Sequence, residues 1–217
     1  GLAEKPERHR ALVVTPDPAS PQASYVTERG EINNPDGWRA WYVHDRRSPA
    51  HDPTNPVGWA EPEVRLAPHE GRQFDALHGV AMYTFSRIHH GGLMQTFDTT
   101  PGELLRAGGY AHAWSSNTDD AFHSEGVGRH AFSAIEGETQ HNQATFRVGI
   151  DPTGGTDPTA DTVVWGPGIH VYNAYAPVPE LRVEALGASA TLFTSQRFLW
   201  PFKHCDGYWD ALYVYAV

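Results

Sequence analysis

Short runs of alternating apolar and polar residues, separated by turn-forming residues, recur along the chain. In ATFRVGI (144–150) every second residue is apolar, from Ala144 to Ile150. Thr145 and Arg147 fall between them and point to the opposite side of an extended backbone. This period of two is typical of a β-strand with one buried face.

Comparable runs predict further strands, whereas helical patterning is nearly absent. They are WRAWYVH (38–44), GVAMYTFS (79–86), GLMQTF (92–97), GYAHAWSS (109–116), TVVW (162–165), IHVYN (169–173), ELRVEAL (180–186), ATLFTS (190–195) and YWDALYVYA (208–216). Turn-forming residues, 21 Gly and 17 Pro, separate them. The pattern predicts an all-β fold, a two-sheet antiparallel jelly-roll sandwich with long loops.

The length of 217 residues fits one sandwich domain. Residues 1–22 are polar and Pro-rich, and we interpret them as a leader or linker. The single domain is expected to span residues 23–217. Two polar stretches, 45–61 and 116–140, are expected to be long loops, and such loops often carry function.

The charge balance limits the classes of partner. The formal net charge is −10 and no run of Lys or Arg occurs, which argues against nucleic acids and anionic membrane surfaces. No apolar stretch approaches the roughly 20 residues that span a bilayer, so membrane insertion is not expected. The one cysteine, Cys205, excludes an intrachain disulfide and a cysteine-based zinc site.

Several segments carry a family resemblance. They are DGWRAWY (36–42), GGLMQTFDTTPG (91–102), YAHAWSS (110–116), FRVGIDPTGGTDPTADTVVW (146–165), ELRVEALGASATLF (180–193) and WPFKHCDGYWDALYV (200–214). Over most of residues 25–217 the chain resembles extracellular bacterial domains related to carbohydrate-binding modules of families 4, 9 and 22, which are galactose-binding-like jelly rolls. The first strand departs from the family, because SYVTERGEI (24–32) stands where its NPSFE-like strand belongs. The resemblance implies an extracellular or secreted module that binds carbohydrate.

The last predicted strand contains an acidic residue at an apolar position. Asp210 shares its strand face with Leu212 and Val214, so its carboxylate is expected to point towards the core. A buried carboxylate needs a cation, a set of hydrogen-bond donors or a proton. By the resemblance, Asp210 is a ligand for a structural calcium ion, with Glu28 or Glu31 as partner. Otherwise Asp210 is solvated, or pairs with an arginine or Lys203.

Aromatic residues favour a sugar ligand on physical grounds. The chain has seven Trp and nine Tyr, and aromatic rings stack on the flat C–H faces of sugars. Core packing is the alternative for each of these rings. The expected ligand-binding residues are Trp41, His112, Trp114, Gln143 and Trp165. Trp165 ends the loop IDPTGGTDPTADTVVW (150–165), which either shapes the rim of a binding face or is a long turn capped by its Asp side chains.

An enzyme is a further alternative. His89 and His90 are adjacent and would point to opposite faces of a strand, which makes them a poor chelating pair. His112 could meet His123 or His141 in space. A carboxylate pair for glycoside hydrolysis could come from Asp119, Asp120, Glu125 and Glu136, although these lie in a polar loop. No GxSxG, HExxH or phosphate-loop motif is present.

Three functions remain open from the sequence. The first is a non-catalytic module that recognises a polysaccharide or surface glycan. The second is a structural or assembly subunit of a cell surface, filament or viral particle, which predicts self-association and an N-terminal arm that docks on a neighbouring molecule. The third is an enzyme, which requires a cleft with convergent His and carboxylate groups.

Overall fold

The structure is a computed structural model that describes residues 10–13, 23–26, 31–35, 37–43, 58–67, 72–75, 79–116 and 143–217. The regular elements of these residues are all β-strands. They are β1 (Arg10–Val13), β2 (Ala23–Val26), β3 (Glu31–Asn34), β4 (Arg39–Tyr42), β5 (Glu63–Ala67), β6 (Gly79–Phe85), β7 (His90–Asp98), β8 (Leu104–Ser116), β9 (Ala144–Asp151), β10 (Val164–Trp165), β11 (Ile169–His170), β12 (Ala176–Glu184), β13 (Ser189–Phe198) and β14 (His204–Ala216). The part of the chain that is described contains no helix of the length and hydropathy that crossing a bilayer requires.

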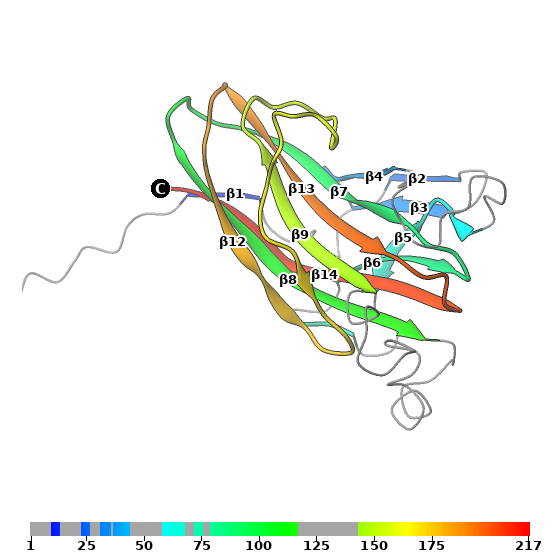
Figure 1. Cartoon of the computed structure of the whole chain (residues 1–217). Coiled ribbons are helices and arrows are strands. Elements are labelled where there is room, and N and C mark those ends of the chain that lie inside the picture. The colour runs from blue at the N-terminus through cyan, green and yellow to red at the C-terminus, as the bar shows by residue number, and fades with distance from the viewer. Residues whose placement is uncertain are drawn as a thin grey trace, which may run out of the picture.

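The strands form two sheets that pack face to face (Figure 1). An eight-stranded sheet has the order β12-β8-β14-β6-β5-β3-β2, and β1 joins it beside β14. A six-stranded sheet has the order β10-β9-β13-β7-β4, and β11 joins it beside β9. The prediction of an all-β, two-sheet sandwich is confirmed. One pairing differs from the antiparallel expectation, because β3 and β5 run parallel where Ile32 meets Val64.

The main apolar core lies between the two sheets. In β9 the residues Phe146, Val148 and Ile150 are fully buried, as the period of two predicts. From the opposite sheet Leu105 and Trp209 join the same cluster. Each large apolar side chain buried in this way stabilises the fold by about 1.5–3 kcal/mol relative to its exposed state.

A buried polar network crosses this core from one sheet to the other. The side-chain amide of Gln196 on β13 donates to the carbonyl of Met82 on β6 at 2.7 Å and to Nε2 of His89 at 2.7 Å. Its oxygen accepts the indole N–H of Trp209 on β14 at 3.1 Å. Gly207 leaves the space for this amide, because a Cβ at that position would lie 2.3 Å from the Gln196 oxygen.

The network assigns the proton of His89. Nε2 of His89 accepts a hydrogen bond from Gln196, so this nitrogen carries no proton. Nδ1 lies 2.9 Å from the hydroxyl of Thr84, which itself donates to the carbonyl of Arg87. His89 is therefore neutral with its proton on Nδ1, and every polar atom of this buried chain has a partner of the matching kind.

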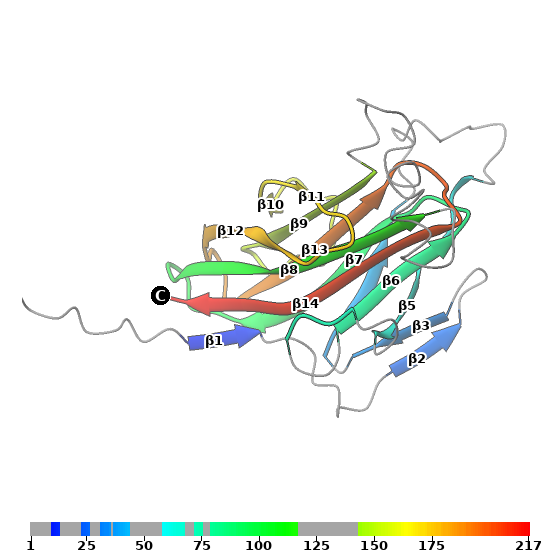
Figure 2. The same ribbon diagram turned by 90° about the horizontal axis from the view of Figure 1, so that it is seen from below.

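A segment of the predicted leader contributes one strand to the fold. β1 lies within residues 1–22 and pairs with the end of β14, with Arg10 opposite Ala216 (Figure 2). The physical reason is the edge of β14. β6 pairs only with residues 204–209, so the backbone of residues 214–216 has an edge for another strand.

Two predicted strands agree closely with the structure. β6 spans 79–85 and β9 spans 144–151, close to the predicted ranges. β8 begins at Leu104 rather than at residue 109, directly after the turn at Pro101–Gly102. Of the predicted loops, 45–57 and 117–140 lie outside the described residues.

Burial of His89 predicts a pH-dependent stability. Burial first, and repulsion from His90 second, lower the pKa of His89 from 6.5 to about 3. Between these values the unfolded chain binds a proton that the folded chain does not, so stability is complete above pH 6.5 and falls as the pH falls. His89 is expected to contribute about 1.4 kcal/mol per pH unit to this loss, and the buried His112 adds to it. Urea unfolding between pH 7.5 and 4.5 measures it.

A free energy of unfolding that stays constant from pH 6.5 to 4.5 would contradict the neutral, buried state assigned to His89.

Candidate functional site

Both outward faces of the sandwich carry aromatic side chains. On the six-stranded sheet, Trp41, Met94, Val163 and Phe193 form a cluster outside the main core, and Trp165 packs against it. On the eight-stranded sheet the second cluster is Ala81, Tyr83, Trp114 and Tyr208, with Tyr172 and Tyr175 packed against it. Of the expected ligand-binding residues, Trp41 and Trp165 thus lie on one face and Trp114 lies on the opposite one.

Trp41 anchors β4 to the outward side of the six-stranded sheet. In the register of β4 against β7, Trp41 lies opposite Gly92. The indole N–H of Trp41 donates to the carbonyl of Thr194 on β13 at 3.1 Å. Its ring packs against Trp165, with 6.2 Å between the centroids, and edge-on against His90 at 5.5 Å. Only 6 % of Trp41 is exposed, so it supports this face from below and presents little surface to a ligand.

Trp165 lies across the outward side of β9. A Cβ on Gly149 would come within 2.5 Å of its ring, so the indole can pack here only because residue 149 is a glycine. The guanidinium of Arg147 lies over the ring, 4.4 Å from the centroid. Trp165 is half-buried. A cation–π contact therefore holds Arg147 against the ring of Trp165.

A pocket of about 400 Å³ opens beside these rings. Its described lining residues are His90, Thr145, Arg147, Gly168, Ser195 and Arg197. Strand register explains why they meet, because Arg197 pairs with both His90 and Thr145, and Ser195 pairs with Arg147. Residues that are directly opposite in a sheet share a face.

Hydrogen-bonding side chains converge on this pocket. Nε2 of His90 lies 3.1 Å from the hydroxyl of Ser195. At the other side, Nδ1 of His170 lies 3.2 Å from the hydroxyl of Thr145. Together with Arg147 and Arg197, these groups offer donors and acceptors of the kind that orient a polar ligand in a concave site.

The face of β8 that carries Trp114 is covered, and His112 is buried beside it. Trp114 is 1 % exposed and stacks on Tyr172, while the guanidinium of Arg72 lies 4.8 Å from its ring centroid. His112 packs between Tyr175 and Tyr208. Burial, and then the charge of Arg72, lower the pKa of His112 to about 3.

Residues 72–75, which we call the strap, cover this face of the sheet. Hydrogen bonds to Asp210 hold the strap in place. The Asp210 carboxylate accepts the backbone N–H groups of Phe74 at 2.9 Å and Asp75 at 3.2 Å. Its other oxygen accepts the N–H of Ala211 at 2.7 Å. Phe74 then stacks on Tyr110. Asp210 is completely buried, and backbone N–H donors contact both of its carboxylate oxygens. Of the three predicted possibilities, a cation, a set of donors or a proton, the structure shows the set of donors.

The face of Asp210 differs from the predicted one. A β-bulge falls between Asp210 and Tyr213, and Ala211 has a φ of 46°. The extra residue turns Asp210 to the side of Tyr208, while Leu212 and Val214 face the core. The strict alternation assumed from the sequence fails here because a bulge shifts the register by one residue.

Gln143 occupies a connecting position inside the fold. It is fully buried, and its amide nitrogen donates to the hydroxyl of Ser115 at 3.0 Å and to the carbonyl of Trp200 at 2.7 Å. Its oxygen accepts the N–H groups of Leu199 and Trp200. These bonds fix the turn after β13, and the structure leaves Gln143 no exposed surface for a ligand.

The structure does not describe the predicted acidic partners of Asp210. Glu28 lies outside the described residues, and of Glu31 only the backbone is described. Within the described part of the chain no three His, Cys, Asp or Glu residues gather as a metal site would require. His123, His141 and the acidic residues of the 117–140 segment are likewise outside it.

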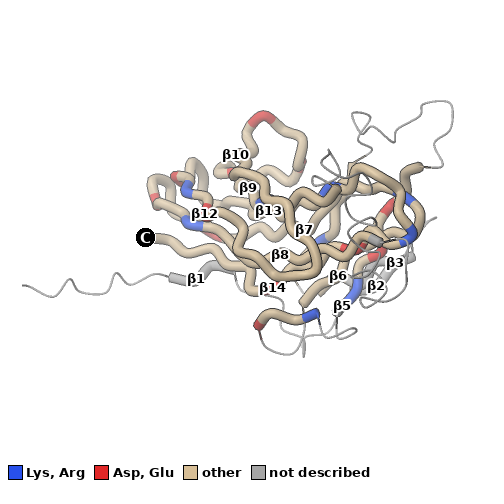
Figure 3. The backbone as a smooth tube through the Cα atoms, turned by 60° about the horizontal axis from the view of Figure 1, so that its bottom comes forward, with Lys and Arg blue, Asp and Glu red and all other residues tan. Residues whose placement is uncertain are grey.

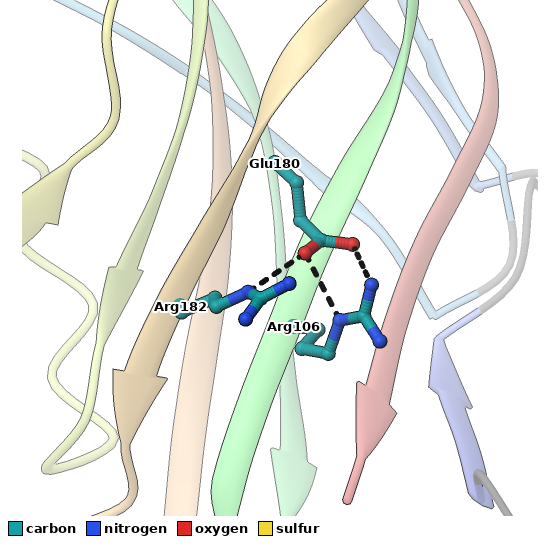
Figure 4. Close-up of polar contacts among 3 residues, drawn as sticks. All are labelled: Arg106, Glu180 and Arg182. Carbon is teal, nitrogen blue, oxygen red and sulfur yellow. Dashed lines mark hydrogen bonds and ion pairs between the residues drawn. The ribbon is translucent and has the colours of Figure 1, made fainter. Parts of the chain in front are cut away.

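A charged cluster occupies the outward side of β8 and β12 (Figure 4). Arg106 donates to both oxygens of Glu180, at 3.0 and 2.7 Å, and Arg182 donates to one of them at 3.0 Å. Hydrogen bonds from Arg106 lower the pKa of Glu180. The Arg182 side chain is 62 % exposed. This cluster joins two strands at the surface, where ion pairs add about 0–1 kcal/mol.

Sequence reasoning missed most of the pocket. Arg147 and Thr145 were recognised as outward residues of β9, but nothing in the sequence showed which strands lie beside them. The placement of His89 and His90 on opposite faces is confirmed: His89 joins the core network and His90 lines the pocket. The loop before Trp165 uses its acidic residues as caps, with Asp151 accepting the N–H of Thr153 and Asp157 that of Thr159.

Comparison with known proteins concerns the fold. No family model matches the chain, and no curated protein matches it. Among solved structures, the chain is similar to the enzymatically active domain of bacteriophage CBA120 tailspike protein 4, with 12 % identity over 84 % of this chain and a TM-score of 0.50. It spans 20 % of that tailspike chain.

Two carbohydrate-binding structures are also similar. TmCBM61, solved in complex with β-1,4-galactotriose, is 11 % identical over 84 % of this chain and 90 % of its own, with a TM-score of 0.49. The CBM22-1 xylan-binding domain of Paenibacillus barcinonensis Xyn10C is 10 % identical over 83 % and 86 %, with a TM-score of 0.44. These likenesses, all at 12 % identity or less, concern the fold alone.

Calcium at Asp210 stays a prediction, and thermal melting checks it. If an ion binds there, calcium raises the melting temperature relative to EDTA, because a ligand that binds only the folded state stabilises it. Asp210→Asn, which keeps the shape of the side chain, should abolish the shift. Equal melting temperatures of the wild type in calcium and in EDTA would contradict a calcium site.

Proposed function

We propose that the protein is a non-catalytic, extracellular carbohydrate-binding module, and that its ligand-binding site is the pocket on the outward face of the six-stranded sheet. The observation that carries the proposal is the convergence of two arginines, a histidine and two hydroxyl side chains in one pocket beside Trp41 and Trp165. Sugars present hydroxyl groups at their ring edges, and such groups are recognised by side chains that donate and accept hydrogen bonds.

The position of the pocket on rigid strands supports this proposal. Its lining residues come mainly from β7, β9 and β13, which pair over most of their lengths. Side chains held on paired strands keep their spacing without a ligand, and a preorganised site loses less entropy on binding. A pocket of about 400 Å³ has room for a small number of sugar units, for which micromolar to millimolar affinity is expected.

The contrast between the two faces supports the choice of this one. On the eight-stranded sheet, Arg72 and Tyr172 lie over Trp114, and Tyr175 packs on His112. On the six-stranded sheet, the pocket borders Arg147, which lies over the half-buried Trp165. We therefore assign Trp165 a role in the site and regard Trp114 and His112 as parts of the packing on the opposite face.

Replacing Trp165 tests the proposal. Trp165→Ala removes the ring that supports Arg147, so the affinity for a retained glycan should fall about tenfold, in keeping with a cation–π contact of about 0.5–1 kcal/mol and lost aromatic surface. Affinity electrophoresis on a panel of polysaccharides measures the change. Phe85→Ala, which truncates an exposed ring on the eight-stranded sheet, is the matched control and should bind like the wild type.

Two results would overturn this assignment. Retention that Phe85→Ala reduces and Trp165→Ala leaves intact would move the site to the other sheet. If a folded wild type is retained by no polysaccharide, the carbohydrate function fails and the alternative of an assembly subunit is preferred. Its self-association would then be measured by sedimentation.

A further inference from the structure

We infer that the ligand of this pocket is an acidic glycan, whose carboxylate or sulfate groups bind between Arg147 and Arg197. The inference rests on the proposed carbohydrate function and names the substrate class of the same site. It is carried by the charge of the lining residues, by their positions on β9 and β13, and by the contact between Arg147 and Trp165.

The lining of the pocket is basic in an acidic protein. Its six described residues include Arg147, Arg197 and His90, and none of the six is an aspartate or glutamate. The chain as a whole carries a formal net charge of −10. A protein of this charge repels polyanions over most of its surface, so a local group of arginines is the feature that would allow it to bind one.

Among the described residues, two acidic side chains of the segment 151–162 are engaged within that segment. Asp157 and Asp161 belong to the loop before β10, where Figure 3 shows acidic positions along the tube. Asp157 is engaged within that loop by the backbone and hydroxyl of Thr159. Asp151 is engaged in the same way by Thr153 and Thr162. These carboxylates are held by their own loop.

Strand register sets the spacing of the two arginines. Arg147 pairs with Ser195, and Arg197 lies two residues further along the same strand, so the arginines are diagonal neighbours on one face. Diagonal neighbours in an antiparallel pair lie about 7–8 Å apart. Guanidinium groups on long side chains can reach one anionic group from both sides at this distance, or two groups on successive sugars.

The contact with Trp165 limits the positions that Arg147 can take, because its guanidinium carbon lies 4.4 Å from the ring centroid. A planar guanidinium presents pairs of N–H donors, which carboxylates and sulfates accept in a bidentate manner. The hydroxyls of Thr145 and Ser195 contact His170 and His90. Each hydroxyl has further hydrogen-bonding capacity for a neutral hydroxyl group of the sugar.

The test compares acidic with neutral polysaccharides on the whole chain. We expect retention on polygalacturonate or on dextran sulfate, weakening as NaCl is raised from 50 to 500 mM, and no retention on neutral galactan or xylan. The two acidic polymers distinguish a carboxylate ligand from a sulfate ligand. Arg197→Gln and Arg147→Gln should each lower the affinity about tenfold, the loss expected for a charge-assisted hydrogen bond.

Arg182→Gln is the matched control, because it removes the same charge from an exposed position on the opposite sheet. It should bind like the wild type. If all three variants lose affinity equally, the binding follows net charge and the inference is overturned. Retention on a neutral glycan, without salt dependence, overturns the acidic ligand and keeps the proposed function. Retention on neither class, by a protein that melts cooperatively, overturns both.

Discussion

The buried amide of Gln196 is the contact on which the arrangement of this sandwich depends. It bonds to the backbone of β6, to the indole of β14 and to His89, and so ties the six-stranded sheet to the eight-stranded one at the centre of an otherwise apolar core. Apolar side chains tolerate small shifts between sheets. A buried amide whose bonds are all made does not, because losing any one of them leaves an unpaired polar group that costs about 1–3 kcal/mol.

This network also determines where the pocket residues lie. Ser195 and Arg197 flank Gln196 on β13, and His90 follows His89. Since side chains alternate across a strand, holding Gln196 and His89 inward holds their neighbours outward. A slip of one residue would exchange the two sets and bury an arginine. The register that satisfies the core therefore places the pocket lining at the surface, and the stability of the fold and the geometry of the site have one cause.

The two faces of the sandwich differ because of what covers them. On the eight-stranded sheet the buried charge of Asp210 holds the strap at residues 72–75, and the aromatic rings beneath it become packing. On the six-stranded sheet the aromatic rings support a basic pocket instead. In both places tryptophan acts chiefly as a support for an arginine. Aromatic content alone therefore said little about which face would meet a ligand.

Alternation and turn residues were enough to predict the fold class and most long strands, because a period of two over six or more residues is a local property of the chain. They also placed Thr145 and Arg147 on the outward side of β9, and His89 and His90 on opposite faces. They did not anticipate the bulge at Ala211, which turns Asp210 away from the face of Leu212. Nor did they anticipate β1, whose short sequence has no strong pattern and pairs only because β14 has an edge beside it.

The pairing of strands distant in sequence decided the rest. Trp41 and Trp165 are 124 positions apart by their numbers and meet on one face, whereas His112 and Trp114 lie on the other. Arg147 and Arg197 become neighbours only through the register of β9 against β13. The sequence by itself determined the alternation of inward and outward residues along β9 and the opposite faces of His89 and His90. Only the tertiary structure decided which outward residues share a surface, because that depends on strand order, which no local pattern encodes.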